Sequence, residues 1–179
     1  MSFAFSRRSF LKYTAVAAVA VAGASLFTGC KVDTSDSYNA LRTTPGELTV
    51  LQVTAAMGTY VEASKSYTAP DVTGTTIAFP FKITNGRANP IYVNPNNFKA
   101  TVLDAEGKVI LAKYTASNGL TLDASLCDTN LKKGASVSGN INLTLGAALE
   151  PGQSIVLTYC PDLQYNEYSL NWKTTRAKD

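Results

Sequence analysis

Short stretches of alternating apolar and polar residues cover most of the chain after residue 46. In the clearest stretch, residues 75–85, every second position is large and apolar: Ile77, Phe79, Phe81 and Ile83. A period of two places these side chains on one face, which predicts a β-strand with one buried side. Pro80 falls inside this stretch and has no backbone N–H, so we expect an edge strand or a bulge there.

Similar stretches recur along the chain with turn residues between them: 48–53, 57–62, 91–93, 98–104, 108–116, 137–145, 153–160 and 168–173. Residues 98–104 and 108–116 predict a hairpin around Asp104-Ala105-Glu106-Gly107. Residues 118–130 are polar and fit either a loop or one helical turn. No stretch outside the first 29 residues keeps a helical period, so the pattern predicts an all-β, antiparallel β-sandwich of about seven to nine strands.

The N-terminus has a different pattern, a basic segment followed by an apolar run rich in alanine and valine at 13–27. Ser6-Arg7-Arg8-Ser9-Phe10-Leu11-Lys12 resembles a twin-arginine export signal. The resemblance implies that the twin-arginine export machinery reads four residues: Arg7, Arg8, Phe10 and Leu11. The alternative is an uncleaved membrane anchor, but the run is shorter than the about 20 apolar residues that a span needs. We therefore expect a cleaved signal peptide.

A cysteine follows this apolar run. Leu26-Phe27-Thr28-Gly29-Cys30 resembles a lipobox, with small residues before the cysteine and Phe27 where leucine is usual. The resemblance implies cleavage before Cys30 and lipidation of its thiol, so that the acyl chains hold the protein on the outer face of the cytoplasmic membrane. The alternative is an ordinary signal peptide with an incidental cysteine.

The composition divides the chain into four parts. Residues 1–29 are the expected signal peptide, and residues 30–46 are polar and turn-rich, which indicates a flexible tether. Residues 47–173 carry the alternating pattern and form the expected domain. Residues 174–179 are a polar C-terminal tail.

Charge and composition exclude several classes of protein. The net charge of +3 comes from sixteen basic and thirteen acidic residues, but Arg7, Arg8 and Lys12 belong to the signal. The remainder is formally neutral, which argues against nucleic-acid binding. The sequence contains no histidine, which excludes a histidine zinc site, a blue-copper site and a Ser-His-Asp triad. We therefore expect no cofactor, no metal and no catalytic residue.

Acidic and sulfur-containing side chains are the remaining candidates for chemistry. Asp104 and Glu106 could ligate calcium, but no calcium-loop motif surrounds them, and we expect them to form a turn. Cys127 and Cys160 predict a disulfide, because an even pair in an exported protein is usually oxidised. The alternative is a redox-active or metal-binding thiol pair, which would favour closer spacing such as C-x-x-C.

Several segments resemble the immunoglobulin-like domains of unknown function found in bacterial surface lipoproteins. These are Ile83-Thr84-Asn85, Pro90-Ile91-Tyr92-Val93, Asn97-Phe98, Leu103-Asp104-Ala105-Glu106-Gly107, and L-K-K-G-A-S-V-S-G-N-I-N-L at 131–143. The resemblance covers about residues 48–159 and implies an immunoglobulin-like sandwich. Its motifs are turns and core positions, so it transfers no functional residue.

The leading hypothesis for function is a non-catalytic binding or accessory module of the cell envelope that recognises a protein or a glycan. Tyr165 and Tyr168 stand among polar residues and are the predicted binding surface; the alternative is that the tyrosines complete the core. A structural envelope component without a ligand is the second hypothesis. The third is an enzyme or a cofactor-carrying protein that is exported in its folded state.

Overall fold

The structure is a computed structural model that describes residues 39–111, 114–163 and 168–178. These residues form a sandwich of β-sheets, which confirms the predicted fold class. Within the described ranges no helix has the length and apolar character to cross a membrane. The predicted signal, Cys30, Tyr165 and residues 30–38 of the predicted tether lie outside them.

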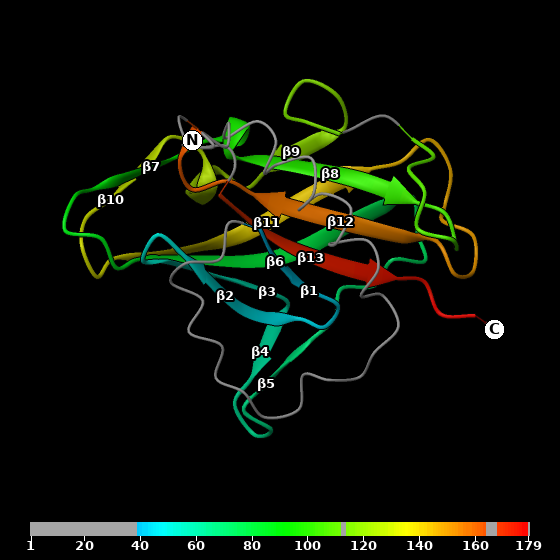
Figure 1. The fold of residues 1–179 in the computed structure, drawn as a ribbon, viewed down its shortest axis with the longest axis horizontal. Coiled ribbons are helices and arrows are strands. Elements are labelled where there is room, and N and C mark those ends of the chain that lie inside the picture. The colour runs from blue at the N-terminus through cyan, green and yellow to red at the C-terminus, as the bar shows by residue number, and fades with distance from the viewer. Residues whose placement is uncertain (1–38, 112–113, 164–167, 179) are drawn as a thin grey trace, which may run out of the picture. The chain divides into compact units, whose positions relative to one another are not determined.

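Two main sheets make up the sandwich (Figure 1). The four-stranded sheet has the order β1-β13-β12-β8, with β1 at Asn39–Arg42, β13 at Ser169–Thr175, β12 at Ser154–Tyr159 and β8 at Phe98–Leu103. The five-stranded sheet has the order β2-β3-β6-β11-β9, with β2 at Gly46–Val50, β3 at Val53–Met57, β6 at Thr76–Asn85, β11 at Ser136–Thr144 and β9 at Leu120–Leu122.

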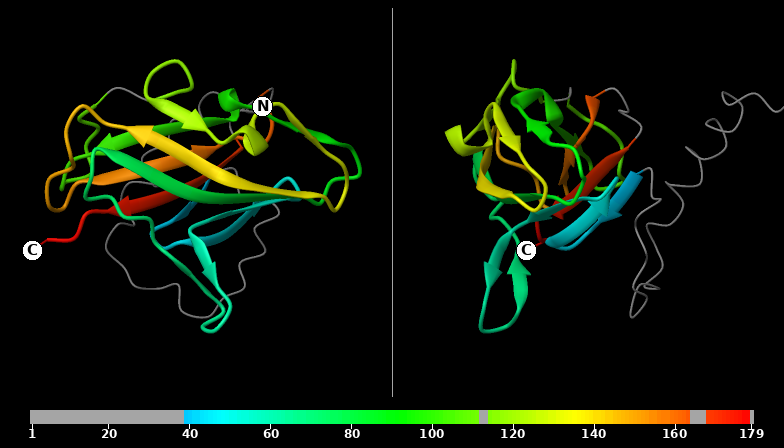
Figure 2. Two further views of the ribbon diagram at one scale, coloured as in Figure 1. Left: turned by 180° about the vertical axis from the view of Figure 1, so that it is seen from behind. Right: turned by 90° about the vertical axis from the view of Figure 1, so that its left-hand side faces the viewer.

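Two further strand pairs and two short 3-10 helices complete the described elements. One pair joins β7, Ile91–Val93, to β10, Thr129–Leu131, and the helices are η2, Pro95–Asn97, and η3, Ala124–Leu126. The other pair joins β4, Thr59–Val61, to β5, Ser66–Thr68. The β4-β5 hairpin projects away from the two main sheets (Figure 2).

The connectivity is that of an immunoglobulin-like sandwich. In chain order, β3, β6, β8, β9, β11, β12 and β13 occupy the places of strands A to G. The orders β3-β6-β11-β9 and β13-β12-β8 then match the A-B-E-D and G-F-C sheets. β1 extends the second sheet by pairing with β13 in parallel, which differs from the all-antiparallel expectation. β2 extends the first.

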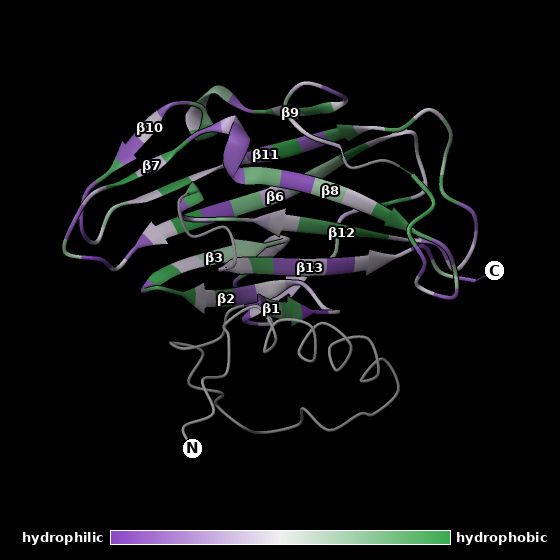
Figure 3. Ribbon diagram, turned by 45° about the horizontal axis from the view of Figure 1, so that its top comes forward, coloured by the Kyte–Doolittle hydropathy of each residue, from purple (hydrophilic) through white to green (hydrophobic). Residues whose placement is uncertain are grey.

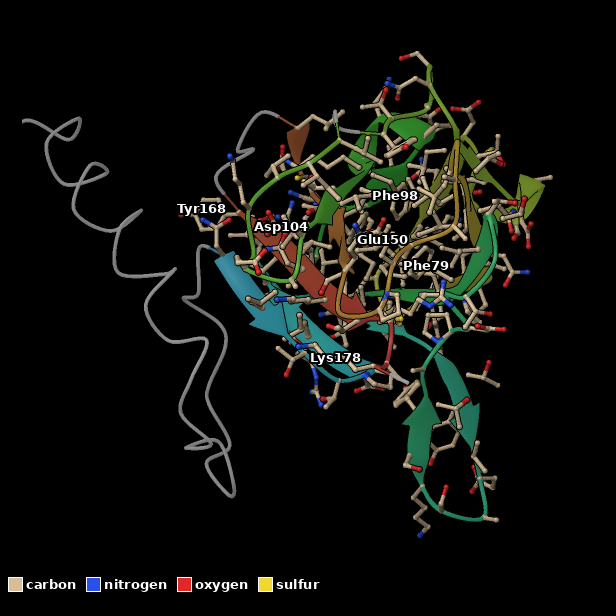
Figure 4. All side chains as sticks on the ribbon, turned by 90° about the vertical axis from the view of Figure 1, so that its right-hand side faces the viewer. Phe79, Phe98, Asp104, Glu150, Tyr168 and Lys178 are labelled. Atoms are coloured by element: carbon tan, nitrogen blue, oxygen red, sulfur yellow. The ribbon has the colours of Figure 1, made fainter. Side chains whose placement is uncertain are left out.

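The alternating pattern of β6 places its large apolar side chains between the sheets, as predicted. Phe79 on β6 and Phe98 on β8 both point into this interior (Figure 4). Apolar and polar residues alternate along β6 and β11, whereas Ile155, Val156 and Leu157 form an uninterrupted apolar run in β12 (Figure 3). Aromatic rings meet at the centre: Phe81 lies edge-on to Trp172 with ring centroids 5.2 Å apart, and Phe98 stacks on Tyr159 at 5.0 Å.

Pro80 does not mark an edge strand, which corrects the prediction. β6 is internal, with β3 on one side and β11 on the other. The Pro80 carbonyl accepts a hydrogen bond from the Gly58 N–H at 2.8 Å, so the proline nitrogen faces the same side. β3 ends at Met57 on that side, and the chain leaves for the β4-β5 hairpin. The missing N–H therefore falls where β6 has no strand to pair with.

The domain begins earlier than predicted. The sequence pattern assigned residues 30–46 to a tether, but Asn39–Arg42 forms β1. Ser169 Oγ donates to Asn39 Oδ1 at 2.6 Å, and Asn171 Nδ2 donates to the Ala40 carbonyl at 3.1 Å. Hydrogen bonds from distant residues hold this strand, so a pattern of apolar residues could not reveal it.

The predicted disulfide is absent from the structure, where Cys127 and Cys160 are both free. Cys127 lies between η3 and β10, and its thiol donates to the Leu122 carbonyl at 3.8 Å. Cys160 follows β12 of the four-stranded sheet and is buried. Its backbone N–H donates to the Asn97 carbonyl, and its carbonyl accepts from Asn97 Nδ2. Burial raises the pKa of the Cys160 thiol and so favours the neutral form.

Candidate binding groove

A groove of about 610 Å³ lies between the β4-β5 hairpin and the five-stranded sheet. Strands β2, β6 and β11 and the hairpin supply its lining: Glu47, Gly58, Thr59, Tyr60, Tyr67, Pro80, Phe81, Lys82, Ser138, Gly139 and Asn140. Because this lining comes from segments almost one hundred residues apart, the groove exists only in the folded domain.

The sheet register brings the polar side chains of the groove together. Alternation along β6 points Pro80 and Lys82 away from the core, while Phe79 and Phe81 are buried. In the register of β6 with β11, Lys82 pairs with Ser138 and Pro80 pairs with Asn140. Side chains of directly opposed residues lie on the same face of a sheet. Lys82, Ser138 and Asn140 therefore form one polar surface, with the Pro80 ring beside it.

Two tyrosines on the hairpin form the aromatic wall. Tyr60 on β4 and Tyr67 on β5 are cross-strand partners, with ring centroids 5.1 Å apart and ring planes at 61°. The Tyr67 hydroxyl donates to Glu47 Oε1 at 2.8 Å, which ties the hairpin to β2. Tyr60 is 48% exposed. One ring is thus fixed by its hydroxyl, and the other is open to solvent beside it.

Glycine is required where the hairpin leaves the sheet. Gly58 has a φ of +106°, which L-residues with a side chain rarely adopt. A Cβ added there would lie 2.5 Å from the Thr68 carbonyl oxygen and 2.8 Å from Pro45 Cβ. The close approach of β5 to this turn sets the position of Tyr67 relative to Glu47.

The amide of Asn140 is held in one orientation. Asp123 Oδ2 accepts hydrogen bonds from the Asn140 backbone N–H at 2.7 Å and from Asn140 Nδ2 at 3.0 Å. The Asn140 carbonyl oxygen Oδ1 therefore remains as an acceptor in the groove. The Lys82 ammonium and the Ser138 and Tyr60 hydroxyls make no hydrogen bond within the described ranges.

The pKa of Tyr67 is raised to about 12. Burial is the main cause, and the hydrogen bond to Glu47 is the second. An unperturbed tyrosine has a pKa of about 10. Because the folded-state pKa is the higher one, the stability due to protonated Tyr67 is complete below about pH 10 and is lost as the pH rises towards 12.

We expect Glu47→Gln to lower the pKa of Tyr67, because a neutral amide replaces the charged acceptor, while burial keeps it above its usual value. Ultraviolet absorbance titration of tyrosinate checks this, with Tyr67→Phe as the control that identifies the signal of this residue. An unchanged Tyr67 titration in Glu47→Gln would show that the bond to Glu47 does not contribute.

Of the two predicted binding residues, Tyr168 lies within the described ranges and does not line this groove. Tyr168 is half-buried and packs against the hydrophobic core. Tyr165, Cys30 and the export residues Arg7, Arg8, Phe10 and Leu11 lie outside the described ranges, so their roles stay predictions. Sequence reasoning included Tyr60 and Tyr67 among the tyrosines that could form a binding face, but preferred Tyr165 and Tyr168. The signal available in the sequence was a short hairpin pattern after Gly58, with a tyrosine before and a tyrosine after the polar turn at 62–66.

Several acidic side chains serve local structure. Asp104 Oδ1 accepts from the backbone N–H of Lys108 at 2.7 Å and of Glu106 at 3.1 Å, which confirms its predicted turn role. Asp71 accepts from the Thr73 backbone and hydroxyl, and these bonds lower its pKa. No group of three or more histidine, cysteine, aspartate or glutamate residues within the described ranges could hold a metal ion.

No protein-family model and no curated protein matches the chain. Three solved structures are distantly similar. The candidate lipoprotein YcdA from Bacillus subtilis subsp. subtilis strain 168 is 13% identical with a TM-score of 0.44, over 74% of this chain and 39% of YcdA. The YjhA protein from Bacillus subtilis is 10% identical with a TM-score of 0.44, over 76% and 98%.

An uncharacterised β-sandwich protein from Clostridium difficile 630 is 7% identical with a TM-score of 0.42, over 75% of this chain and 93% of that one. The chain thus spans well under half the length of YcdA, and nearly all of the other two. At these identities the likeness concerns the fold alone.

Proposed function

We propose that this protein is a non-catalytic binding module of the bacterial cell envelope, which a lipidated Cys30 holds at the membrane and which recognises a protein or a glycan. The observation that carries the proposal is the groove beside the β4-β5 hairpin, where an exposed tyrosine stands next to a fixed one. Aromatic side chains with polar neighbours are typical of recognition surfaces.

The rigidity of the groove supports binding. Its floor is a sheet face in which β6 and β11 pair along nine residues of each strand. Tyr67 is tied to Glu47, and Asn140 is tied to Asp123. A ligand would therefore meet side chains that are already in place, which reduces the entropy lost on binding.

The use of acidic groups supports a non-catalytic role. Glu47 accepts from Tyr67, Asp123 from Asn140, and Asp128 from the Tyr92 hydroxyl at 2.8 Å. Asp162 forms an ion pair with Arg87 at 3.3 Å. Each of these carboxylates already satisfies a structural donor, and the chain has no histidine to serve as a general base.

The proposed anchor keeps the groove near the membrane. The export and lipobox motifs precede residue 31, and β1 begins at Asn39. The chain from Cys30 to Asn39 spans at most about 30 Å when it is fully extended. A ligand within or beside the membrane surface layer is therefore accessible to the groove.

Site-specific photo-crosslinking in living cells tests the proposal. A photoreactive amino acid at position 60 should form an adduct of higher mass, because Tyr60 lines the groove. The same amino acid in place of Tyr92 is the matched control, since Tyr92 is 54% exposed but lies outside the groove lining. A structural envelope component without a ligand would give no adduct specific to position 60, and that result would contradict the proposal.

A further inference from the structure

We infer that the ligand of the groove is a neutral polysaccharide of pyranose rings that lies across the outer face of the five-stranded sheet. The inference rests on the proposed binding function and names the class of ligand. Charge, backbone pairing and the hydrogen-bonding character of the lining support it.

The groove is electrically balanced. Its charged lining residues are one cation, Lys82, and one anion, Glu47. An acidic polymer would need an excess of lysine or arginine to neutralise its charge, as nucleic-acid-binding surfaces show. The lining therefore favours a ligand without net charge.

The floor does not offer a site for strand addition. A peptide that binds as an added strand needs an exposed sheet edge with free N–H and carbonyl groups. Beside the groove, β6 pairs with β11 on one side; on the other side β3 pairs only as far as Phe81, and Pro80 has no N–H and its carbonyl already accepts from Gly58. On the outer side of β11, the Asn140 N–H and carbonyl both bond to Asp123, and the Ser138 carbonyl accepts from the Ser125 hydroxyl. Only side chains of the floor face the ligand.

The lining offers both donors and acceptors around an aromatic ring. The Lys82 ammonium donates, Asn140 Oδ1 accepts, and the Ser138 hydroxyl does both. Sugar hydroxyls also donate and accept, while the C–H face of a pyranose ring is apolar. A ring stacked on Tyr60 would bury its apolar face and direct its hydroxyls to the floor.

The polar surface continues beyond the groove along the outer face. Thr49 and Thr54 share a hydrogen bond of 2.9 Å between β2 and β3, and Thr84 and Ser136 share one of 2.7 Å between β6 and β11. Thr54 and Thr84 are register partners, so these hydroxyls form one row across four strands. Three spacings of about 4.8 Å give a row of about 14 Å, which suits a chain of several rings.

Isothermal titration calorimetry of the full chain tests the inference, in a zwitterionic detergent without a sugar headgroup. The probes are chitohexaose and cellohexaose, both neutral, with polygalacturonate as the acidic comparison. We expect at least one hexasaccharide to bind and Tyr60→Ala to weaken it about tenfold or more. Tyr92→Ala, which removes an exposed tyrosine outside the groove, should leave the affinity unchanged.

Three results would overturn the inference: neither hexasaccharide binds, polygalacturonate binds more tightly than both, or Tyr60→Ala binds as the wild type does. The crosslinking result separates this failure from failure of the proposed function. A protein adduct at position 60 without sugar binding would remove the polysaccharide and keep the binding module. If neither an adduct at position 60 nor sugar binding were found, the polysaccharide ligand and the proposed binding function would both be contradicted.

Discussion

Trp172→Ala should lower the free energy of unfolding by about 3–5 kcal/mol, the largest loss expected from any single substitution in this domain. Trp172 is completely buried in β13 at the centre of the aromatic cluster. Its ring packs edge-on against Phe81 at 5.2 Å, and its Nε1–H donates to the Gly46 carbonyl at 2.9 Å. The substitution therefore opens a cavity and removes that hydrogen bond. Urea denaturation followed by circular dichroism measures the loss.

Trp172→Phe is the control that separates packing from hydrogen bonding. Phenylalanine keeps an aromatic ring against Phe81 but cannot donate to Gly46, so we expect a smaller loss, of about 1–3 kcal/mol. Equal losses in the two variants would mean that the hydrogen bond and not the packing dominates. A loss below about 1 kcal/mol in Trp172→Ala would contradict the placement of this residue in the core.

Asn85→Ala should be the second most damaging substitution, with a loss of about 2–4 kcal/mol. The Asn85 side chain is fully buried at the end of β6. Its Nδ2 donates to the carbonyls of Leu131 at 2.9 Å and Asn89 at 3.0 Å, and its Oδ1 accepts from the Arg87 N–H at 2.8 Å. Alanine would leave these three backbone groups without their partner.

Asn89→Ala is the matched control in the same turn, because the Asn89 side chain is exposed and only its backbone carbonyl is used. We expect a change within about 0.5 kcal/mol. Chemical denaturation of both variants checks the pair. If Asn85→Ala proved as mild as Asn89→Ala, the hydrogen bonds of Asn85 would contribute little to stability.

These asparagines explain the motifs that resemble lipoprotein domains. Asn85 joins the end of β6 to Leu131, and Asn97 Nδ2 donates to the Cys160 carbonyl at 2.8 Å, which joins the start of β8 to the end of β12. Both residues fix loops at strand ends. The resemblance therefore indicated the fold and the loop structure, and gave no information about a ligand.

Local signals were sufficient for much of the fold. The two-residue period identified the inner face of β6, and Asp104 before Gly107 identified a turn, because each depends on neighbours in the sequence. β1 was missed because its partners Ser169 and Asn171 lie about 130 residues away. The disulfide was predicted wrongly because the cysteine count says nothing about where each thiol faces.

The groove could not be predicted either, because it depends on contacts between residues that are far apart in the sequence. It needs the register that brings Lys82 beside Ser138 and the hydrogen bond that draws Tyr67 to Glu47. Neither follows from the spacing of residues along the chain. The outward positions of β6 and β11 were visible in the alternation, but which of them face the hairpin depends on where β3 ends.

Nuclear magnetic resonance mapping with chitohexaose tests most directly whether the groove is the binding site. Amide signals of the isotope-labelled chain would be followed as the hexasaccharide is added. The account predicts that the largest shifts belong to β4, β5, Lys82 and the segment from Ser138 to Asn140, and that Tyr60→Ala removes them. Shifts that cluster on the four-stranded sheet or around Tyr92 instead, and persist in Tyr60→Ala, would contradict it.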